Sequence, residues 1–230
     1  MPPEPKPTTS SFAILGLLAV APFTAYELTA QARRSLHWVW PRSERSLYSE
    51  PKRLVTLGWA ATRDRRTGRR TVAEYHITAA GRRALRAWLA TPPAEPTAEI
   101  EAMLRVVFAD AGDLDDLRSA LVQNRARLDT AVRTHLLGQA RGYLDDGGPF
   151  PDRLHLIGLF SDFYLRFVEM LDDWTDTALA ELDTWPDTRD VGMTPAARAT
   201  FERVLARYAH DDPPAAPSSH QVVRSADDVE

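Results

Sequence analysis

The sequence of 230 residues predicts a mainly α-helical protein in two parts. Residues 43–57 have the spacing of an amphipathic helix, and two short segments rich in aromatic and β-branched residues follow. A proline-rich stretch at 92–96 comes next. Beyond it, the apolar residues of 113–146 and 151–185 recur every seven positions, which is typical of packed helices. We therefore expect three helices with a two-stranded hairpin, followed by an antiparallel helical pair.

Composition changes along the chain place the domain boundaries. The expected division is a disordered tail at 1–11, a first domain at 12–91, a stiff linker at 92–96, a helical domain at 97–210 and a second disordered tail at 211–230.

The first domain is expected to begin with two helices. Phe12–Val20 is apolar and predicts a buried helix. Thr24-Ala-Tyr-Glu27 has the pattern of a capping box and predicts a second helix from Thr24 to about Ser35. After the third helix, Trp59–Thr62 and Thr71–Ile77 predict the two strands. Thr78 is expected to cap a further helix that ends near Ala90.

The helix at 43–57 has two contrasting faces. Ser43 is suited to begin it and Gly58 to end it. Leu47, Leu54 and Leu57 share one face. The other side carries the cations and hydroxyls that contact DNA phosphates and base edges. The candidate DNA-binding residues of this helix are Ser43, Arg45, Ser46, Tyr48, Ser49, Lys52 and Arg53. A solvated surface helix is the alternative reading.

The expected hairpin turn runs from Arg63 to Arg70 and contains five arginines. Gly68 permits a tight turn. Five like charges at one tip repel one another unless an anion neutralises them, which favours a polyanionic partner. A merely solvated loop is the alternative. The candidate DNA-binding residues of this wing are Arg63, Arg65, Arg66, Thr67, Arg69 and Arg70.

Charge is unevenly distributed along the chain. Fourteen basic and four acidic residues lie between Arg33 and Arg86, which gives this segment a charge of +10. The whole chain has a formal net charge of −4, so the remainder carries −14. This separation indicates a DNA-binding part and an acidic part with another task.

Several short motifs, in this order and spacing, resemble the winged-helix domain of PadR-type transcriptional regulators. They are Ile14-Leu15-Gly16-Leu17-Leu18, Tyr26-Glu27-Leu28, Ser46-Leu47-Tyr48, Lys52-Arg53-Leu54, Leu57-Gly58, Tyr75-His76-Ile77-Thr78-Ala79-Ala80-Gly81, Leu85 and Trp88-Leu89. The chain departs from the family at Ala25, where glycine is usual, and at Pro51, where leucine is common. Because proline lacks an N–H, we expect a bend near Glu50.

The second domain is expected to form a homodimer. The helix at 113–146 places Asn124 and His135 on its seam, and Asp145-Asp146-Gly147-Gly148-Pro149 forces the chain back. Thr97–Asp110 and Thr194–His210 are expected to be further amphipathic helices, the last with Phe201, Val204, Leu205 and Tyr208 inward. The apolar surface exceeds what one copy covers, which favours burial against a second copy. PadR-type regulators resemble this layout, with C-terminal helices that dimerise.

Sequence patterns for catalysis are weak. The chain has no cysteine, and its six histidines show no pair at the helical spacing of metal ligands. Neither a nucleophile elbow nor a phosphate-binding glycine loop is present. We expect no enzymatic activity, no metal and no cofactor. The lack of cysteine is compatible with the reducing cytoplasm, where we expect the protein to act.

Aromatic side chains provide one candidate effector pocket. Flat apolar molecules bind between rings, although aromatic residues at helical spacing are more often core. The candidate pocket residues are Trp88, Phe160, Phe163, Tyr164, Phe167 and Trp174.

Together these features predict a sequence-specific, dimeric DNA-binding repressor that an aromatic small molecule releases from double-stranded DNA. The alternative is a protein-interaction module, in which the winged helix is a scaffold and the acidic helical hairpin binds a partner.

Overall fold

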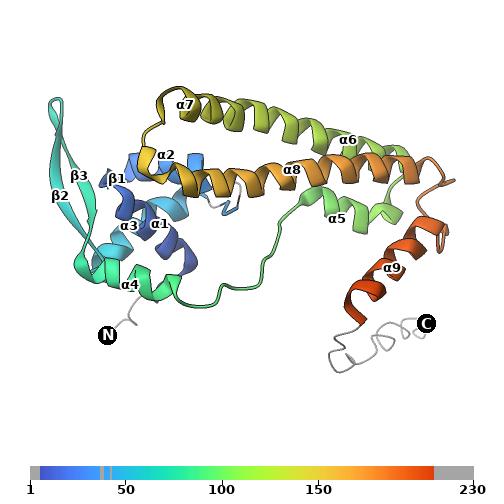
Figure 1. The fold of residues 1–230 in the computed structure, drawn as a ribbon, viewed down its shortest axis with the longest axis horizontal. Coiled ribbons are helices and arrows are strands. Elements are labelled where there is room, and N and C mark those ends of the chain that lie inside the picture. Colours follow the sequence, from blue (N-terminus) through green and yellow to red (C-terminus); the bar gives the residue numbers. More distant parts are fainter. Residues whose placement is uncertain (1–5, 37–38, 42, 210–230) are drawn as a thin grey trace, which may run out of the picture. The chain divides into compact units, whose positions relative to one another are not determined.

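The computed structural model describes residues 6–36, 39–41 and 43–209 (Figure 1). These divide into two compact units. The first contains the described residues up to Glu99 together with His135–Pro151, and the second contains Ile100–Thr134 and the described residues from Asp152 onward. The expected helical domain at 97–210 is therefore not one unit. The expected tail at 211–230 lies outside the described residues.

Three helices form the core of the first unit: α1 (Thr9–Val20), α2 (Ala25–Leu36) and α3 (Glu44–Thr56). The buried core residues are Ile14, Leu15, Leu18, Leu28, Ala32, Leu47, Leu54, Ala60 and Tyr75. The expectation of a tail at 1–11 is wrong for its last residues. Thr8 and Ser11 form a capping box, so α1 begins at Thr9.

A three-stranded antiparallel sheet joins this core, in the order β1 (Phe23–Thr24), β3 (Arg70–Ile77), β2 (Ala60–Thr67). The strands β2 and β3 pair from Ala60 opposite Ile77 to Thr67 opposite Arg70. The expected eight-residue turn from Arg63 to Arg70 is wrong, because the strands continue to a tight turn at Gly68 and Arg69. Gly68 there has a φ of 60°. Most of the arginines thus lie along the strands and not at the tip.

Helix α4 (Ala79–Leu89) begins where expected, since the Thr78 hydroxyl accepts a hydrogen bond from the Gly81 N–H at 3.0 Å. Gly81 allows close packing: a Cβ there would lie 2.2 Å from the Trp59 carbonyl oxygen. Leu89, the last residue of this helix, is exposed. Helix α7 (Gly138–Asp146) also belongs to this unit and ends at Gly147, whose φ is 77°.

The second unit contains α5 (Glu101–Val107), α6 (Leu114–Ala131), α8 (Leu154–Leu182) and α9 (Pro195–Tyr208). Helices α6 and α8 pack side by side around Leu117, Leu121 and Leu182 (Figure 1). Short 3-10 segments, Ala109–Ala111 and Pro151–Arg153, precede α6 and α8. Arg118 pairs with Asp183, and Arg125 further along α6 pairs with Asp176 earlier in α8, so the two helices run antiparallel.

Three expectations about these helices are wrong. Helix α5 begins at Glu101 and not at Thr97. The predicted continuous helix at 113–146 contains a π-helical segment, Val132–Leu137, which changes the angular register, and His135 is exposed and not on the seam. The side chains of α9 that were expected inward are all exposed. Among the described residues, no helix is both long and apolar enough to span a bilayer.

Candidate nucleic-acid interface

Helix α3 presents the two faces that its sequence predicts. Leu47 and Leu54 are buried, and Leu57 just after the helix is half-buried. Gly58 follows with a φ of 69°, which suits a residue without a side chain. The residues exposed to solvent are Ser43, Arg45, Tyr48, Ser49 and Lys52. The side chain of Ser46 lies outside the described part of the structure.

A buried carboxylate in the middle of α3 connects this helix to α1. Glu50 is 6% exposed, and its Oε2 accepts a hydrogen bond of 2.8 Å from the Ser11 hydroxyl of α1. Its Oε1 lies 3.7 Å from Nη1 of Arg53, which is half-buried. Arg53 is thus drawn toward Glu50, unlike the exposed cations of the same helix. Pro51 is buried and α3 runs through it without interruption; the bend expected near Glu50 stays a prediction.

The hairpin of β2 and β3 carries four exposed arginines, Arg63, Arg66, Arg69 and Arg70, and the exposed Thr67. Successive residues of a strand point to opposite faces, so Arg63 and Arg66 project from different sides of β2. The structure therefore spreads positive charge along both faces of the wing.

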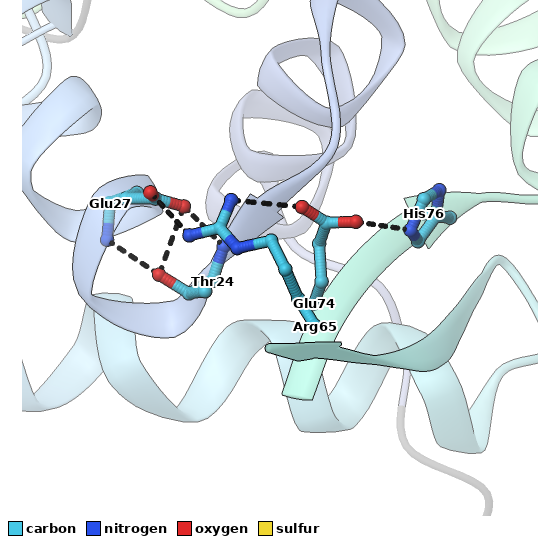
Figure 2. Close-up of polar contacts among 5 residues, drawn as sticks. All are labelled: Thr24, Glu27, Arg65, Glu74 and His76. Atoms are coloured by element: carbon cyan, nitrogen blue, oxygen red, sulfur yellow. Dashed lines mark hydrogen bonds and ion pairs between the residues drawn. The ribbon is translucent and has the colours of Figure 1, made fainter. Parts of the chain in front are cut away.

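Arg65 differs from these four because it is half-buried and bonded within the protein (Figure 2). Its Nη2 donates to Oε1 of Glu27 at 2.5 Å, and its Nη1 donates to Oε1 of Glu74 at 2.9 Å. The second oxygen of Glu74 lies 2.7 Å from Nε2 of His76. The Arg65 guanidinium, followed by the Thr24 backbone N–H, lowers the pKa of Glu27 below its ordinary value. Arg65 was predicted to contact DNA, and the structure instead gives it two carboxylate partners.

An open groove of about 550 Å³ lies between α2, α3 and the wing. Tyr26 and Tyr48 line it, together with Arg65, Thr67 and Val72. Tyr26 is 73% exposed. Tyr26 belongs to one of the sequence motifs but was not among the predicted site residues. The available signal was a large aromatic residue beside a helix cap, on the polar side of α2.

The candidate effector residues fall in both units. Trp88 stacks on Phe12 in the first unit, with ring centroids 5.0 Å apart and planes 4° apart. The other five, Phe160, Phe163, Tyr164, Phe167 and Trp174, lie on α8.

Within α8 the five residues have different surroundings. Tyr164 is buried, and this burial raises its pKa to about 12. Its ring centroid lies 6.5 Å from that of Phe167. Trp174 packs against the cluster of Leu117, Leu121 and Leu182, whereas Phe163 is exposed. Among the residues that the structure describes, no cluster of His, Asp or Glu is arranged to hold a metal ion.

Comparison with known protein families finds a match within the first unit. Residues 14–87 match the model of the transcriptional regulator PadR-like family. These residues form a PadR-like domain. The match runs from within α1 to within α4 and includes the wing, and so confirms the resemblance of the sequence motifs. A search of curated protein sequences finds no match.

Solved structures share the fold beyond the PadR-like domain. A crystal structure of Bacillus subtilis PadR in complex with operator DNA is 22% identical, with a TM-score of 0.63, over 76% of this chain and 99% of that chain. The same protein with p-coumaric acid gives a TM-score of 0.58 at 22% identity, over 79% of this chain and 99% of that chain. The Vibrio cholerae virulence activator AphA gives 0.58 at 23% identity, covering 76% and 98%. The mainly helical fold, with a winged helix and C-terminal helices, is therefore confirmed.

Proposed function

We propose that this protein is a transcriptional regulator that binds double-stranded DNA through α3 and the wing. The observation that carries the proposal is the exposed polar face of α3 in the same PadR-like domain as four exposed wing arginines. Arg45 and Lys52 supply cations, while Ser49 and Tyr48 supply hydroxyls for phosphates or base edges. The structure of Bacillus subtilis PadR with operator DNA supports the same use of this fold.

The regulator is proposed to act as a homodimer. Leu104 and Val107 of α5, and Phe108 just after it, are each more than half exposed in the single chain. The same holds for the apolar side of α9, at Phe201, Val204, Leu205 and Tyr208. Apolar side chains gathered in this way mark an interaction surface. A second copy of the chain would cover them and would place two recognition helices on an inverted repeat.

The dimer is further proposed to repress transcription in the cytoplasm by occupying its DNA site, and to leave that site when an aromatic small molecule binds. Support for the effector comes from the five aromatic residues of α8 and from the structure of Bacillus subtilis PadR with p-coumaric acid. A ligand that binds only one of two conformations shifts the population toward it. Release of bound DNA by p-coumaric acid or related aromatic acids is a direct test of this part.

The test of DNA binding is selection from a library of random duplexes at two salt concentrations, followed by sequencing. An enriched inverted repeat with half-sites about one helical turn apart is the expected result. Replacing Arg63, Arg66, Arg69 and Arg70 with glutamine should weaken binding to that duplex. Loss of four phosphate contacts makes the plot of log affinity against log salt less steep, reducing the magnitude of its negative slope by about 3 to 4.

The matched control replaces four exposed arginines elsewhere, Arg105, Arg133, Arg153 and Arg166, with glutamine. This variant has the same net charge as the wing variant and should retain the wild-type salt slope. Equal losses in the two variants would show that net charge alone attracts DNA, and would contradict a wing contact.

The protein-interaction module remains the second hypothesis, but the acidic surface of α8 is partly neutralised within the chain. Asp162 pairs with Arg166 at 2.9 Å, and Asp176 pairs with Arg125. Fewer free carboxylates are thus available to a basic partner. Capture of one protein at high salt, unaffected by the wing variant, would favour this hypothesis.

A further inference from the structure

The five arginines between Arg63 and Arg70 are not equivalent in their surroundings. Arg65 alone among these five is half-buried, and its guanidinium lies between Glu27 of α2 and Glu74 of β3 (Figure 2). Because two carboxylates already balance the single positive charge of this guanidinium, it adds little attraction for phosphate. Phosphate binding, the role expected of every wing arginine from the sequence, is therefore electrostatically disfavoured for Arg65.

The contacts of Arg65 connect three elements. Arg65 comes from β2, Glu74 from β3, and Glu27 from the first turn of α2. The two N–H···O distances are 2.5 Å to Glu27 and 2.9 Å to Glu74. A planar guanidinium that donates to two carboxylates fixes orientation as well as distance. Helix α2 in turn packs on α3 in the buried core.

Glu27 is itself held in place. Its Oε2 accepts hydrogen bonds from the Thr24 N–H at 2.9 Å and from the Thr24 hydroxyl at 3.0 Å, which leaves Oε1 for Arg65. The same carboxylate thus caps α2 and receives the wing. At the other end, His76 lies 2.7 Å from the free oxygen of Glu74 and restrains that side chain.

We infer that Glu27, Arg65 and Glu74 form a bridge that holds the wing against α2, and that Arg65 is a positioning residue and not a phosphate ligand. The bridge determines where the exposed arginines Arg63 and Arg66 lie relative to α3, the proposed recognition helix. This inference rests on the proposed DNA-binding function for its consequence, whereas the bridge itself is testable in the free protein.

The variant that isolates the bridge is Glu27→Gln. Glutamine serves in a capping box as glutamate does, so its carbonyl oxygen still accepts from Thr24. Its amide nitrogen then faces Arg65 and cannot accept a hydrogen bond from it. Two controls separate other effects: Thr24→Val removes the capping hydroxyl but keeps Glu27, and Arg66→Gln removes an exposed arginine next to Arg65.

The first measurement is amide hydrogen exchange of β2 and β3 in the full-length, DNA-free protein. Glu27→Gln and Arg65→Gln should each accelerate exchange at the base of the wing by roughly two- to fivefold, as the loss of a partly exposed ion pair predicts. Arg66→Gln should leave exchange unchanged. Unchanged exchange in both bridge variants would overturn the inference, whatever the DNA result.

The second measurement is affinity for the selected duplex as a function of salt. Removing the negative charge of Glu27 would tighten DNA binding if simple electrostatics governed the site. A bridge predicts the opposite sign: Glu27→Gln should weaken binding by roughly two- to fivefold at an unchanged salt slope, and Arg65→Gln should do the same. Arg66→Gln should instead lower the slope by about one.

Tighter binding by Glu27→Gln, together with a slope reduced by about one in Arg65→Gln, would identify Arg65 as a phosphate ligand and refute the positioning role. Failure of the wild-type protein to bind any duplex would refute the proposed function and with it the consequence for DNA. In that case hydrogen exchange would still decide whether the bridge holds the wing.

Discussion

The two units of this protein bury their apolar side chains to different extents. In the first unit α1, α2, α3 and the sheet enclose a continuous core, in which Leu54 is fully buried. In the second unit α6 and α8 share a smaller cluster around Leu117 and Leu121. Large apolar side chains there stay in solvent, with Phe201 at 57% and Leu205 at 64% exposure.

The difference shows which unit is complete within one chain. A closed core gives the PadR-like domain a fixed scaffold for the face of α3 and for the wing. The helices of the second unit have an apolar side that no described residue covers, which is typical of an interaction surface. Stability should therefore depend on the single chain in the first unit and on protein concentration in the second.

The largest contrast is expected from leucine truncations in the two units. Leu54→Ala removes a fully buried side chain and should lower the free energy of unfolding by about 2–5 kcal/mol. Leu205→Ala removes an exposed side chain and should change it by less than about 0.5 kcal/mol in the dissociated chain. Urea unfolding at low protein concentration, followed by tryptophan fluorescence, measures both. Similar losses in the two variants would contradict the comparison.

Association should depend on the exposed side of α9. Replacing Phe201 and Leu205 together with aspartate should raise the dimer dissociation constant by about 100-fold or more, because charge is then placed in an apolar contact. Ala199→Asp with Ala206→Asp adds the same charge to the opposite side of the helix and serves as the control. Sedimentation velocity over a concentration series gives both constants. A dimer that tolerates the first pair would place the interface elsewhere.

A smaller effect is expected from the polar contact beneath the recognition helix. Ser11→Ala leaves the buried Glu50 carboxylate without its 2.8 Å donor and should cost about 1–3 kcal/mol of unfolding free energy. Thr130→Ala, which removes an exposed hydroxyl bonded to its own helix, should cost much less. Adding Glu50→Gln to Ser11→Ala should recover part of the loss, since a neutral amide is cheaper to bury. Chemical denaturation of all four proteins checks the series.

Local signals predicted much of the fold. The caps at Thr24 and Thr78 each need a side chain and a backbone N–H only three residues away, and both are confirmed. The seven-residue pattern of α8 was equally informative: Tyr164 and Leu171 are buried where it places them. Such features depend on residues within one or two helical turns, so they can be predicted without knowledge of the tertiary structure.

Features that depend on distant contacts were missed. Strand β1 has two residues and exists through its pairing with Tyr75 and Glu74. The strands of the wing extend through Arg63–Thr67 although charged residues there disfavour a strand, because each residue is paired across the hairpin. The role of Arg65 required Glu27, 38 positions away. The α9 pattern revealed an apolar side but not which molecule covers it.

The smallest expected effect is the pH dependence of the bridge between the wing and α2. The pKa of Glu27 is lowered below its ordinary value in the folded protein, chiefly by the hydrogen bond from Arg65. A carboxylate with a depressed pKa stabilises the fold above its unfolded pKa, and this contribution is lost as the pH falls through the folded value. The side chains of Arg65 and Glu27 are 35% and 39% exposed. Solvent therefore screens the pair, and its contribution to stability is modest.

Titration of the Glu27 carboxyl by NMR, in the wild type and in Arg65→Gln, measures this directly. The pKa of the wild-type carboxyl should lie below the ordinary value for glutamate, and Arg65→Gln should move this pKa upward. In hydrogen exchange, the difference between wild type and Glu27→Gln should be present at neutral pH and vanish once Glu27 is protonated. An unshifted pKa in the wild type would mean that Arg65 and Glu27 do not pair in solution, and the wing would then be free to move independently of α2.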